Sequence, residues 1–201
     1  MRALQREFPD LCMMGYACDF SKQFSLPDHL LNHLPDCPRL AFYPGSSLGN
    51  FSPDQAQTFL TQIKAALAGG ALLIGVDLVK NEAVLNAAYN DSLGITAAFN
   101  KNILLNVNRL LGSNFSIHDF EHQAFFNAKE SRIEMHLQAV RNLTVNWPGG
   151  VLSLKAGDRI HTENSYKYTQ DSLESLLNKS GFSKTRVWVD PKNYFAVAWA
   201  Q

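Results

Sequence analysis

The chain has 201 residues, of which 46% are hydrophobic and 11% aromatic, which suits one domain with a buried core or one domain that carries an insertion. Lysine and arginine total 18, aspartate and glutamate also total 18, and the formal net charge is zero. Because no basic run provides the electrostatic footprint that nucleic acid or anionic lipid requires, both are excluded as partners, and a small zwitterion fits better.

The first part of the chain has the pattern of a parallel sheet. Two short apolar runs, Leu11 to Ala17 and Arg39 to Tyr43, have the length of buried strands. Ser52 followed by Pro53 is typical of a helix start, and apolar residues then recur at helical spacing. The run ALLIGVDL, residues 71–78, predicts the next strand. Strand, helix and strand in this order indicate a βαβ unit in an α/β sheet.

The pattern changes after Asp77. Helical spacing predicts helices over Glu82 to Tyr89 and Thr96 to Leu111, and strand character appears at Gln123 to Phe126, Arg132 to Val140 and His161 to Tyr168. The dipeptides Gly149-Gly150 and Gly157-Asp158 supply turns.

The chain closes with a helix over Gln170 to Lys179 and two strands, Thr185 to Val189 and Phe195 to Trp199. With no repeat or linker, residues 80–167 are interpreted as an insertion packed on a core made of residues 1–79 and 168–201. Open α/β sheets bind ligands beside the carboxyl ends of their strands, so this insertion is expected to recognise the substrate.

The three cysteines, Cys12, Cys18 and Cys37, are odd in number and form no CxxC pair, which argues against a disulfide framework or a four-thiolate zinc site. We interpret them as buried or idle thiols in a reducing cytosol. No apolar stretch approaches the ~20 residues that cross a bilayer, and the first ten residues lack a signal-peptide pattern. A cytoplasmic protein without a membrane partner is expected.

The segment YPGSSLGN, residues 43–50, lies between a strand and a capped helix. Its glycines let the backbone approach a ligand, and Asn50 offers both a donor and an acceptor. An ordinary helix-capping turn explains the segment equally well, and it matches neither GxGxxG nor a P-loop.

Asp19 and Phe20 follow the first apolar run. A carboxylate and an aromatic ring at the end of a strand suit adenine, although a plain strand-to-loop transition is the more common cause. 

In HTENSYKY, residues 161–168, strand alternation places Glu163 and Ser165 on one side. Together they can hold the two nitrogens of an imidazole, or they can belong to a solvated polar strand. Tyr89, at the end of a predicted helix, can donate to a carboxylate or simply pack.

The segment His118 to His122 matches HxxEH, a pattern of zinc peptidases. Its surroundings predict a turn leading to a strand, and no third ligand is evident, so no metal site is expected. The chain also lacks a GxSxG elbow, and Cys18 has no neighbouring base, which excludes an evident hydrolase mechanism.

Six segments taken in chain order resemble the histidine-specific methyltransferase family, typified by the enzyme that makes trimethylhistidine for ergothioneine: YPGSSLGNFSP, GGALLIGVDL, AAYND, TAAFNKNIL, RIEMHL and IHTENSYKY. The resemblance implies a class I, Rossmann-like sheet that binds S-adenosylmethionine, with an inserted α+β domain for histidine. It also implies stepwise methylation of the α-amine without a metal. The closing helix and strands likewise resemble the end of a class I methyltransferase sheet.

On the cofactor side, the resemblance places Asp19 and Phe20 at the adenine and puts Gly45 and Ser46 in the loop beside the cofactor.

On the substrate side, the resemblance places Asn50 at the α-amino and carboxylate groups, Tyr89 at the carboxylate, Met135 in the pocket wall, and Glu163 and Ser165 at the imidazole. The reaction is an in-line attack of a neutral amine on a sulfonium methyl group, which depends mainly on alignment. Asn50 and Tyr89 are therefore the expected catalytic residues, acting by position.

The start of the chain departs from the family. Class I methyltransferases bind S-adenosylmethionine with a glycine-rich loop and an acidic residue after their first two strands, and no such βαβ unit precedes residue 11. We therefore expect the C-terminal two-thirds of such an enzyme, monomeric or paired with a separately encoded N-terminal segment. An inactive remnant, a module that only binds histidine, and a methyltransferase for another small amine remain open.

Overall fold

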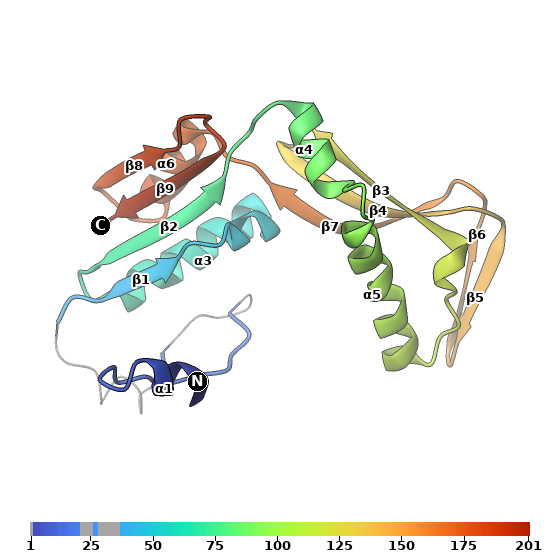
Figure 1. Ribbon diagram of the computed structural model, residues 1–201, viewed down its shortest axis with the longest axis horizontal. Helices are drawn as coiled ribbons and strands as arrows, with labels where there is room; N and C mark the ends of the chain where they lie inside the picture. The colour runs from blue at the N-terminus through green and yellow to red at the C-terminus, as the bar shows by residue number, and fades with distance from the viewer. Residues whose placement is uncertain (1, 21–25, 28–36) are drawn as a thin grey trace.

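The computed structural model describes residues 2–20, 26–27 and 37–201. Figure 1 shows its elements in two groups, joined where β2 leads into α4 and where β7 returns. In chain order they are α1 (Arg2–Glu7), β1 (Leu40–Tyr43), η1 (Ser47–Asn50), α3 (Pro53–Ala66), β2 (Ala71–Asp77), α4 (Glu82–Tyr89), α5 (Ile95–Leu111), η2 (Ile117–Asp119), β3 (Phe120–Asn127), β4 (Arg132–Ala139), β5 (Leu143–Trp147), β6 (Gly150–Leu154), β7 (Arg159–Tyr166), α6 (Gln170–Lys179), β8 (Thr185–Val189) and β9 (Phe195–Ala200).

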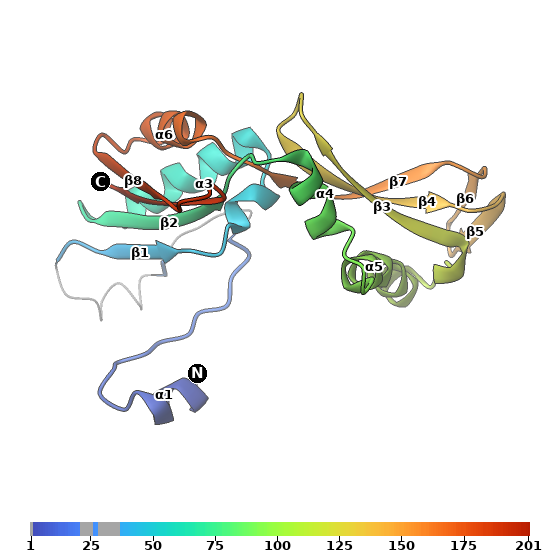
Figure 2. The same ribbon diagram turned by 45° about the horizontal axis from the view of Figure 1, so that its top comes forward.

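The first group is a four-stranded sheet in the order β1-β2-β9-β8. Strands β1 and β2 are parallel, whereas β9 runs antiparallel to both β2 and β8. Helices α3 and α6 lie on the same face of this sheet (Figure 2). The predicted βαβ unit is confirmed, and the protein is α/β with a sheet that corresponds to one end of a Rossmann-like sheet.

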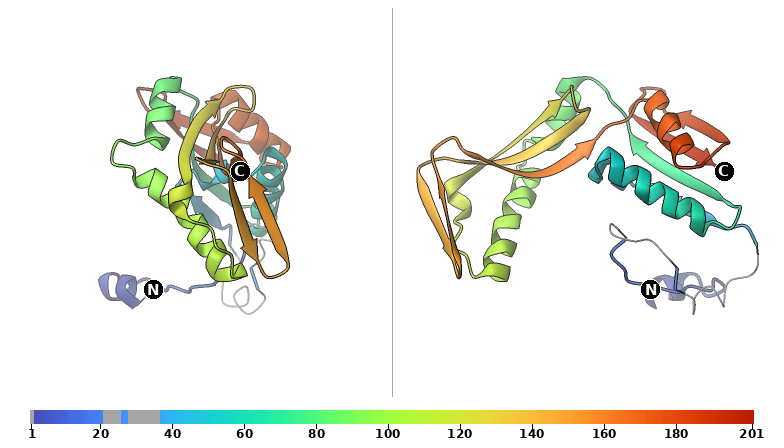
Figure 3. Two further views of the ribbon diagram at one scale, coloured as in Figure 1. Left: turned by 90° about the vertical axis from the view of Figure 1, so that its right-hand side faces the viewer. Right: turned by 180° about the vertical axis from the view of Figure 1, so that it is seen from behind.

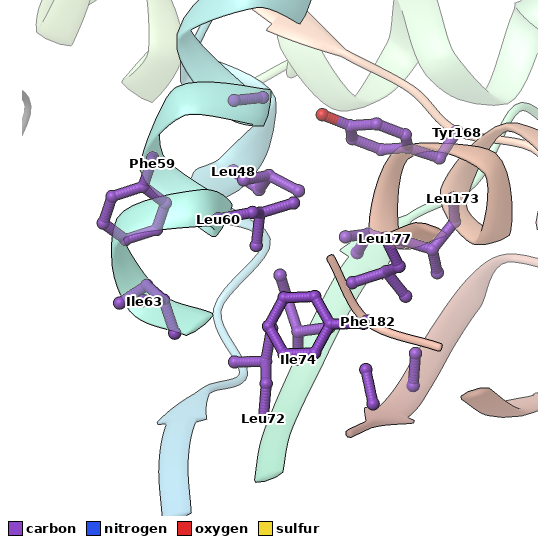
Figure 4. Packing of buried hydrophobic residues seen from close by; sticks show 14 of the residues in the cluster. Leu48, Phe59, Leu60, Ile63, Leu72, Ile74, Tyr168, Leu173, Leu177 and Phe182 are labelled. Atoms are coloured by element: carbon purple, nitrogen blue, oxygen red, sulfur yellow. The ribbon is translucent and has the colours of Figure 1, made fainter. Parts of the chain in front are cut away.

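Local sequence explains why α3 begins where it does. The side chain of Ser52 accepts a hydrogen bond from the backbone of Gln55, whose own side chain accepts one from the backbone of Ser52, and Pro53 occupies the first helical position. This reciprocal capping satisfies backbone donors that the first helical turn leaves free. The apolar stripe of α3 then packs against α6 and the sheet, as Figure 4 shows for Leu60, Leu177 and their neighbours.

The second group is a three-stranded antiparallel sheet in the order β3-β4-β7. Alternate residues of β4 face two small clusters: Ile133 and Met135 pack with Leu85 of α4, and Leu137 packs with Leu104 of α5. Both helices therefore cover one face of this sheet. The hairpin of β5 and β6 lies at the end remote from the first group (Figure 3).

Three expectations need correction. Residues 11–17 form no strand in the described structure, and Leu11, Met14 and Tyr16 are about half exposed. A strand requires a partner for its backbone groups, and this run, however apolar, pairs with none of the described strands. The β5–β6 hairpin was not expected, and β3 begins at Phe120 instead of Gln123.

The interpretation of the cysteines as buried thiols also needs correction. Cys12, Cys18 and Cys37 are free thiols, and all three are exposed, not buried. Across residues 2–20, 26–27 and 37–201, no helix combines the length and apolarity needed to cross a membrane.

Candidate functional site

The two groups of elements touch where η1 lies against β7. Gly49 of η1 is buried, and a Cβ atom on it would lie only 2.7 Å from the carbonyl oxygen of Tyr166. Only glycine permits this approach, because no real Cβ atom comes so close to a backbone oxygen. The next residue, Asn50, is exposed at the end of η1 and thus lies beside β7.

One face of the β3-β4-β7 sheet gathers three of the predicted substrate residues, Met135, Glu163 and Ser165. Glu163 pairs with Met135, and Ser165 pairs with Ile133, so all four side chains share the face that α4 covers. Tyr89, the last residue of α4, packs against this cluster and donates a hydrogen bond to Ser165 Oγ at 2.8 Å. The prediction that Glu163 and Ser165 point to the same side is confirmed.

A buried lysine ties this face to the first sheet. Lys167 Nζ lies 2.7 Å from Ser165 Oγ, 2.9 Å from Tyr89 Oη and 3.1 Å from a carboxylate oxygen of Asp77, the last residue of β2. Asp77 also pairs with Lys80. The side chain of Lys167 is only 2% exposed, so its charge depends on these partners.

Glu163 is half-buried, and its carboxylate accepts no hydrogen bond from any described residue. Desolvation raises its pKa above the ordinary value for a glutamate, because the charged form loses water without gaining a partner. A partly desolvated carboxylate on a sheet face that also carries the Ser165 hydroxyl is well suited to a ligand that brings an N–H donor.

The loop predicted to lie beside the cofactor follows β1. Ser46 has a left-handed backbone (φ 57°), and its N–H donates to the carbonyl oxygen of Gly75 at 3.1 Å. Its Oγ accepts a hydrogen bond of 2.8 Å from the backbone N–H of Asp77. Ser46 therefore holds the loop against the end of β2, while Gly45 is exposed.

Phe20 lies against the aromatic residues next to this loop. Its ring centroid is 6.4 Å from that of Phe51 and 6.0 Å from that of Phe59, and the residue is 44% exposed. The preceding Asp19 is exposed. The structure thus brings Asp19 and Phe20 near the chain that follows Asn50, although no strand leads to them.

Sequence reasoning missed Lys167 and Asp77. Asp77 ends a parallel strand, the usual position of ligand-binding groups in an α/β sheet, and this was a usable signal. Lys167 stands between two tyrosines in a strand read as polar, and no local pattern distinguishes a buried lysine from a solvated one.

The HxxEH histidines do not converge. His118 lies in η2 and His122 in β3, where the His122 ring nitrogens bond to Asn100 at 2.9 Å and to the Tyr89 carbonyl at 2.8 Å. His122 therefore orients α4 and α5 on the sheet.

A different trio, Glu134, His136 and His161, lies on the opposite face, with potential ligand atoms within 4.8 Å of one another. The two imidazole rings are stacked, with centroids 4.5 Å apart and planes inclined by 20°. Lone pairs in stacked rings run nearly parallel and do not point at one ion, and Glu134 is already bonded to Arg132 and Asn127. Metal binding there would require the rings to turn.

The fold and the site together define a Rossmann-like α/β protein whose second sheet gathers polar side chains on the face that α4 covers. The model of one family, described as histidine-specific methyltransferases that depend on S-adenosylmethionine (SAM), matches residues 1–201. The chain belongs to this family.

Two curated relatives are similar over nearly the whole chain. A histidine N-alpha-methyltransferase of Mycolicibacterium smegmatis and one of Mycobacterium tuberculosis are each 34% identical, and the alignments cover 98% of this chain. The chain spans only 61% of the length of either relative. Among solved structures, a SAM-dependent methyltransferase from Clostridium acetobutylicum covers 100% of this chain and 68% of its own, at 11% identity and a TM-score of 0.48.

Proposed function

We propose that the chain carries the acceptor site and part of the cofactor site of an enzyme that transfers methyl groups from SAM to the α-amino group of L-histidine, as in ergothioneine biosynthesis. The observation that carries the proposal is the half-buried carboxylate of Glu163, unpaired among the described residues and on the same sheet face as Ser165, to which Tyr89 donates. Family membership supports the choice of histidine.

Each predicted residue has a role in this proposal. Glu163 and Ser165 bind the imidazole, and Met135, which pairs with Glu163, forms the wall beside it. Asn50 and Tyr89 hold the α-amino and carboxylate groups. A partly buried carboxylate left without its imidazole partner costs about 1–3 kcal/mol, so Glu163 discriminates against other amino acids.

The cofactor-side residues fit an adenosyl group in part. The ring of Phe20 is 44% exposed and suits stacking on the adenine, and the exposed Asp19 precedes it in the chain. Gly45 is open, since the nearest atom to a Cβ there would be 3.8 Å away. The Ser46 side chain accepts a hydrogen bond from the backbone N–H of Asp77 at the end of β2, and it thereby shapes the loop.

SAM, when bound, supplies an electrophilic methyl group. The residues of this chain contribute alignment: Asn50 and Tyr89 hold the amino acid so that its neutral amine faces the cofactor side, and Glu163 anchors the opposite end. Proximity and orientation of this kind can lower the activation free energy of a transfer between two bound partners by a large amount.

We propose that residues 1–79 and 168–201 form the catalytic core and that residues 80–167 form the histidine-recognition insertion. Strand β1 pairs only with β2 among the described strands, and Leu40 and Phe42 are 63% and 67% exposed. An open, apolar edge supports a monomer completed by a separately encoded N-terminal segment. Three exposed free thiols support a reducing, cytoplasmic location.

The test incubates the chain with SAM and histidine, alone and with the unmatched part of the Mycolicibacterium smegmatis relative added as a separate polypeptide, and detects Nα-methylated histidine by mass spectrometry. We expect transfer to histidine in the complemented reaction. Methylation of other amines with histidine ignored would overturn the assignment and favour a different small-amine methyltransferase.

A module that binds histidine without turnover is the second candidate. Its basis is that the acceptor-side residues are held by paired strands and hydrogen bonds, whereas the cofactor-side residues lie on loops. Calorimetry separates the two. Binding of histidine without binding of SAM, in the complemented sample as well, supports the module, and binding of neither indicates an inert remnant.

A further inference from the structure

Lys167 lies where the first sheet meets the insertion, and the proposed contacts with histidine leave it unused. Its side chain is 2% exposed, and its ammonium reaches Ser165 Oγ at 2.7 Å, Tyr89 Oη at 2.9 Å and Asp77 at 3.1 Å. A lysine ammonium has three N–H donors and no acceptor, so these partners use its full capacity.

The two hydroxyl groups that Lys167 contacts also bond to each other, at 2.8 Å. Together the two hydroxyl groups carry two protons and four lone pairs. Lys167 occupies one lone pair on each oxygen, and their mutual bond uses one proton and one further lone pair. One proton and one lone pair remain for a ligand, and they lie on different residues.

We propose that Lys167 is a positioning residue that forces Tyr89 and Ser165 into opposite hydrogen-bonding roles, and so couples recognition of the ligand's carboxylate to recognition of its ring. This inference rests on the proposed function. Without a ligand, Tyr89 donates to Ser165, and Ser165 keeps the outward proton. Lys167 holds the two hydroxyl oxygens 2.8 Å apart, and oxygens this close need a proton between them. When Tyr89 donates to a carboxylate, Ser165 therefore donates to Tyr89 and can only accept from the ring.

One ring nitrogen donates its proton to Ser165. The other ring nitrogen can form a hydrogen bond with the Glu163 carboxylate only if a second proton lies between them. That proton resides either on the ring, opposite an ionised Glu163, or on Glu163, opposite a bare nitrogen. Either way, Glu163 and the ring hold two protons between them in the complex. Of the other charged groups around Lys167, Asp77 is already paired with both Lys167 and Lys80.

The experiment is calorimetry of histidine binding to the full chain at pH 8 in buffers of different ionisation enthalpy, which gives the number of protons taken up. The free ring is neutral there, since its pKa is about 6.5. We expect Lys167→Met to take up about one proton fewer than the wild-type chain, because Ser165 is then free to donate to a bare nitrogen. Any proton exchanged by the α-amino group cancels in this difference.

Lys80→Met is the matched control, since Lys80 also pairs with Asp77 but contacts neither hydroxyl, and it should behave as wild type. Ser165→Ala is a second variant that should lose the same proton if Lys167→Met does not fold. Equal uptake by wild type and the variants would overturn the coupling while leaving histidine as the ligand. Absence of histidine binding to the wild-type chain would overturn the proposed function, and this inference with it.

Discussion

The acceptor side and the cofactor side of the site are held by different kinds of structure. Met135, Glu163 and Ser165 stand on paired strands, and the register of β4 with β7 decides which face they share. Asp19, Phe20, Gly45 and Ser46 all lie outside strands and helices. Paired strands orient a set of side chains at once, whereas loop residues depend on individual contacts such as that of Ser46 with Asp77.

The largest effect is expected on the acceptor side. Glu163→Ala should weaken histidine binding by about 1.5–3 kcal/mol, or roughly 10- to 150-fold, because a hydrogen bond to a charged group is lost. Calorimetry with histidine measures this loss. Glu121→Ala, which removes an exposed glutamate of β3, is the control and should leave the affinity unchanged. Unchanged affinity in Glu163→Ala would remove this residue from the site.

The contact between the two sides is tested by Gly49→Ala. The added Cβ would lie 2.7 Å from the Tyr166 carbonyl oxygen, and overpacking of this kind lowers the free energy of unfolding by roughly 1–3 kcal/mol. Denaturant unfolding measures the change. Gly45→Ala is the matched control, since its nearest neighbour lies 3.8 Å away. Equal free energies of unfolding for the two variants would show that η1 shifts to accommodate the added methyl group without loss of stability.

A smaller effect is expected on the cofactor side. Phe20→Ala should weaken SAM binding by roughly 0.5–1.5 kcal/mol through the loss of one stacking surface. The measurement is calorimetry with SAM on the complemented chain, with Phe8→Ala, another exposed phenylalanine, as control. An equal loss in both variants would argue against a specific role for Phe20.

The smallest effect is a pH dependence of stability. Burial raises the pKa of Glu163, so the folded chain holds this proton more tightly than the unfolded chain. The free energy of unfolding therefore falls as pH rises from the unfolded pKa, about 4.3, through the folded one. Glu163→Gln should melt higher than wild type at pH 7.5, with the difference vanishing near pH 4. The opposite order at pH 7.5 would mean that Glu163 is stabilised by a charge.

Local patterns predicted most of the regular elements. The start of α3 follows from Ser52 and Pro53, and the parallel pairing of β1 with β2 follows from the βαβ order. They were misleading for residues 11–17, where apolar residues occur in a strand-like run without a described partner strand. Chain-local preference does not provide the partner that a strand requires.

The sequence by itself determined which residues share a face of β7, because side chains alternate along any strand, and its ordered segments indicated the family. Only the tertiary structure decided that Lys167 is buried against Asp77, Tyr89 and Ser165. Three of these residues lie in β2, α4 and β7, and Lys167 follows the end of β7, so they are up to 90 positions apart in the chain. A buried charge is retained only where the fold supplies its partners, and no local pattern records them.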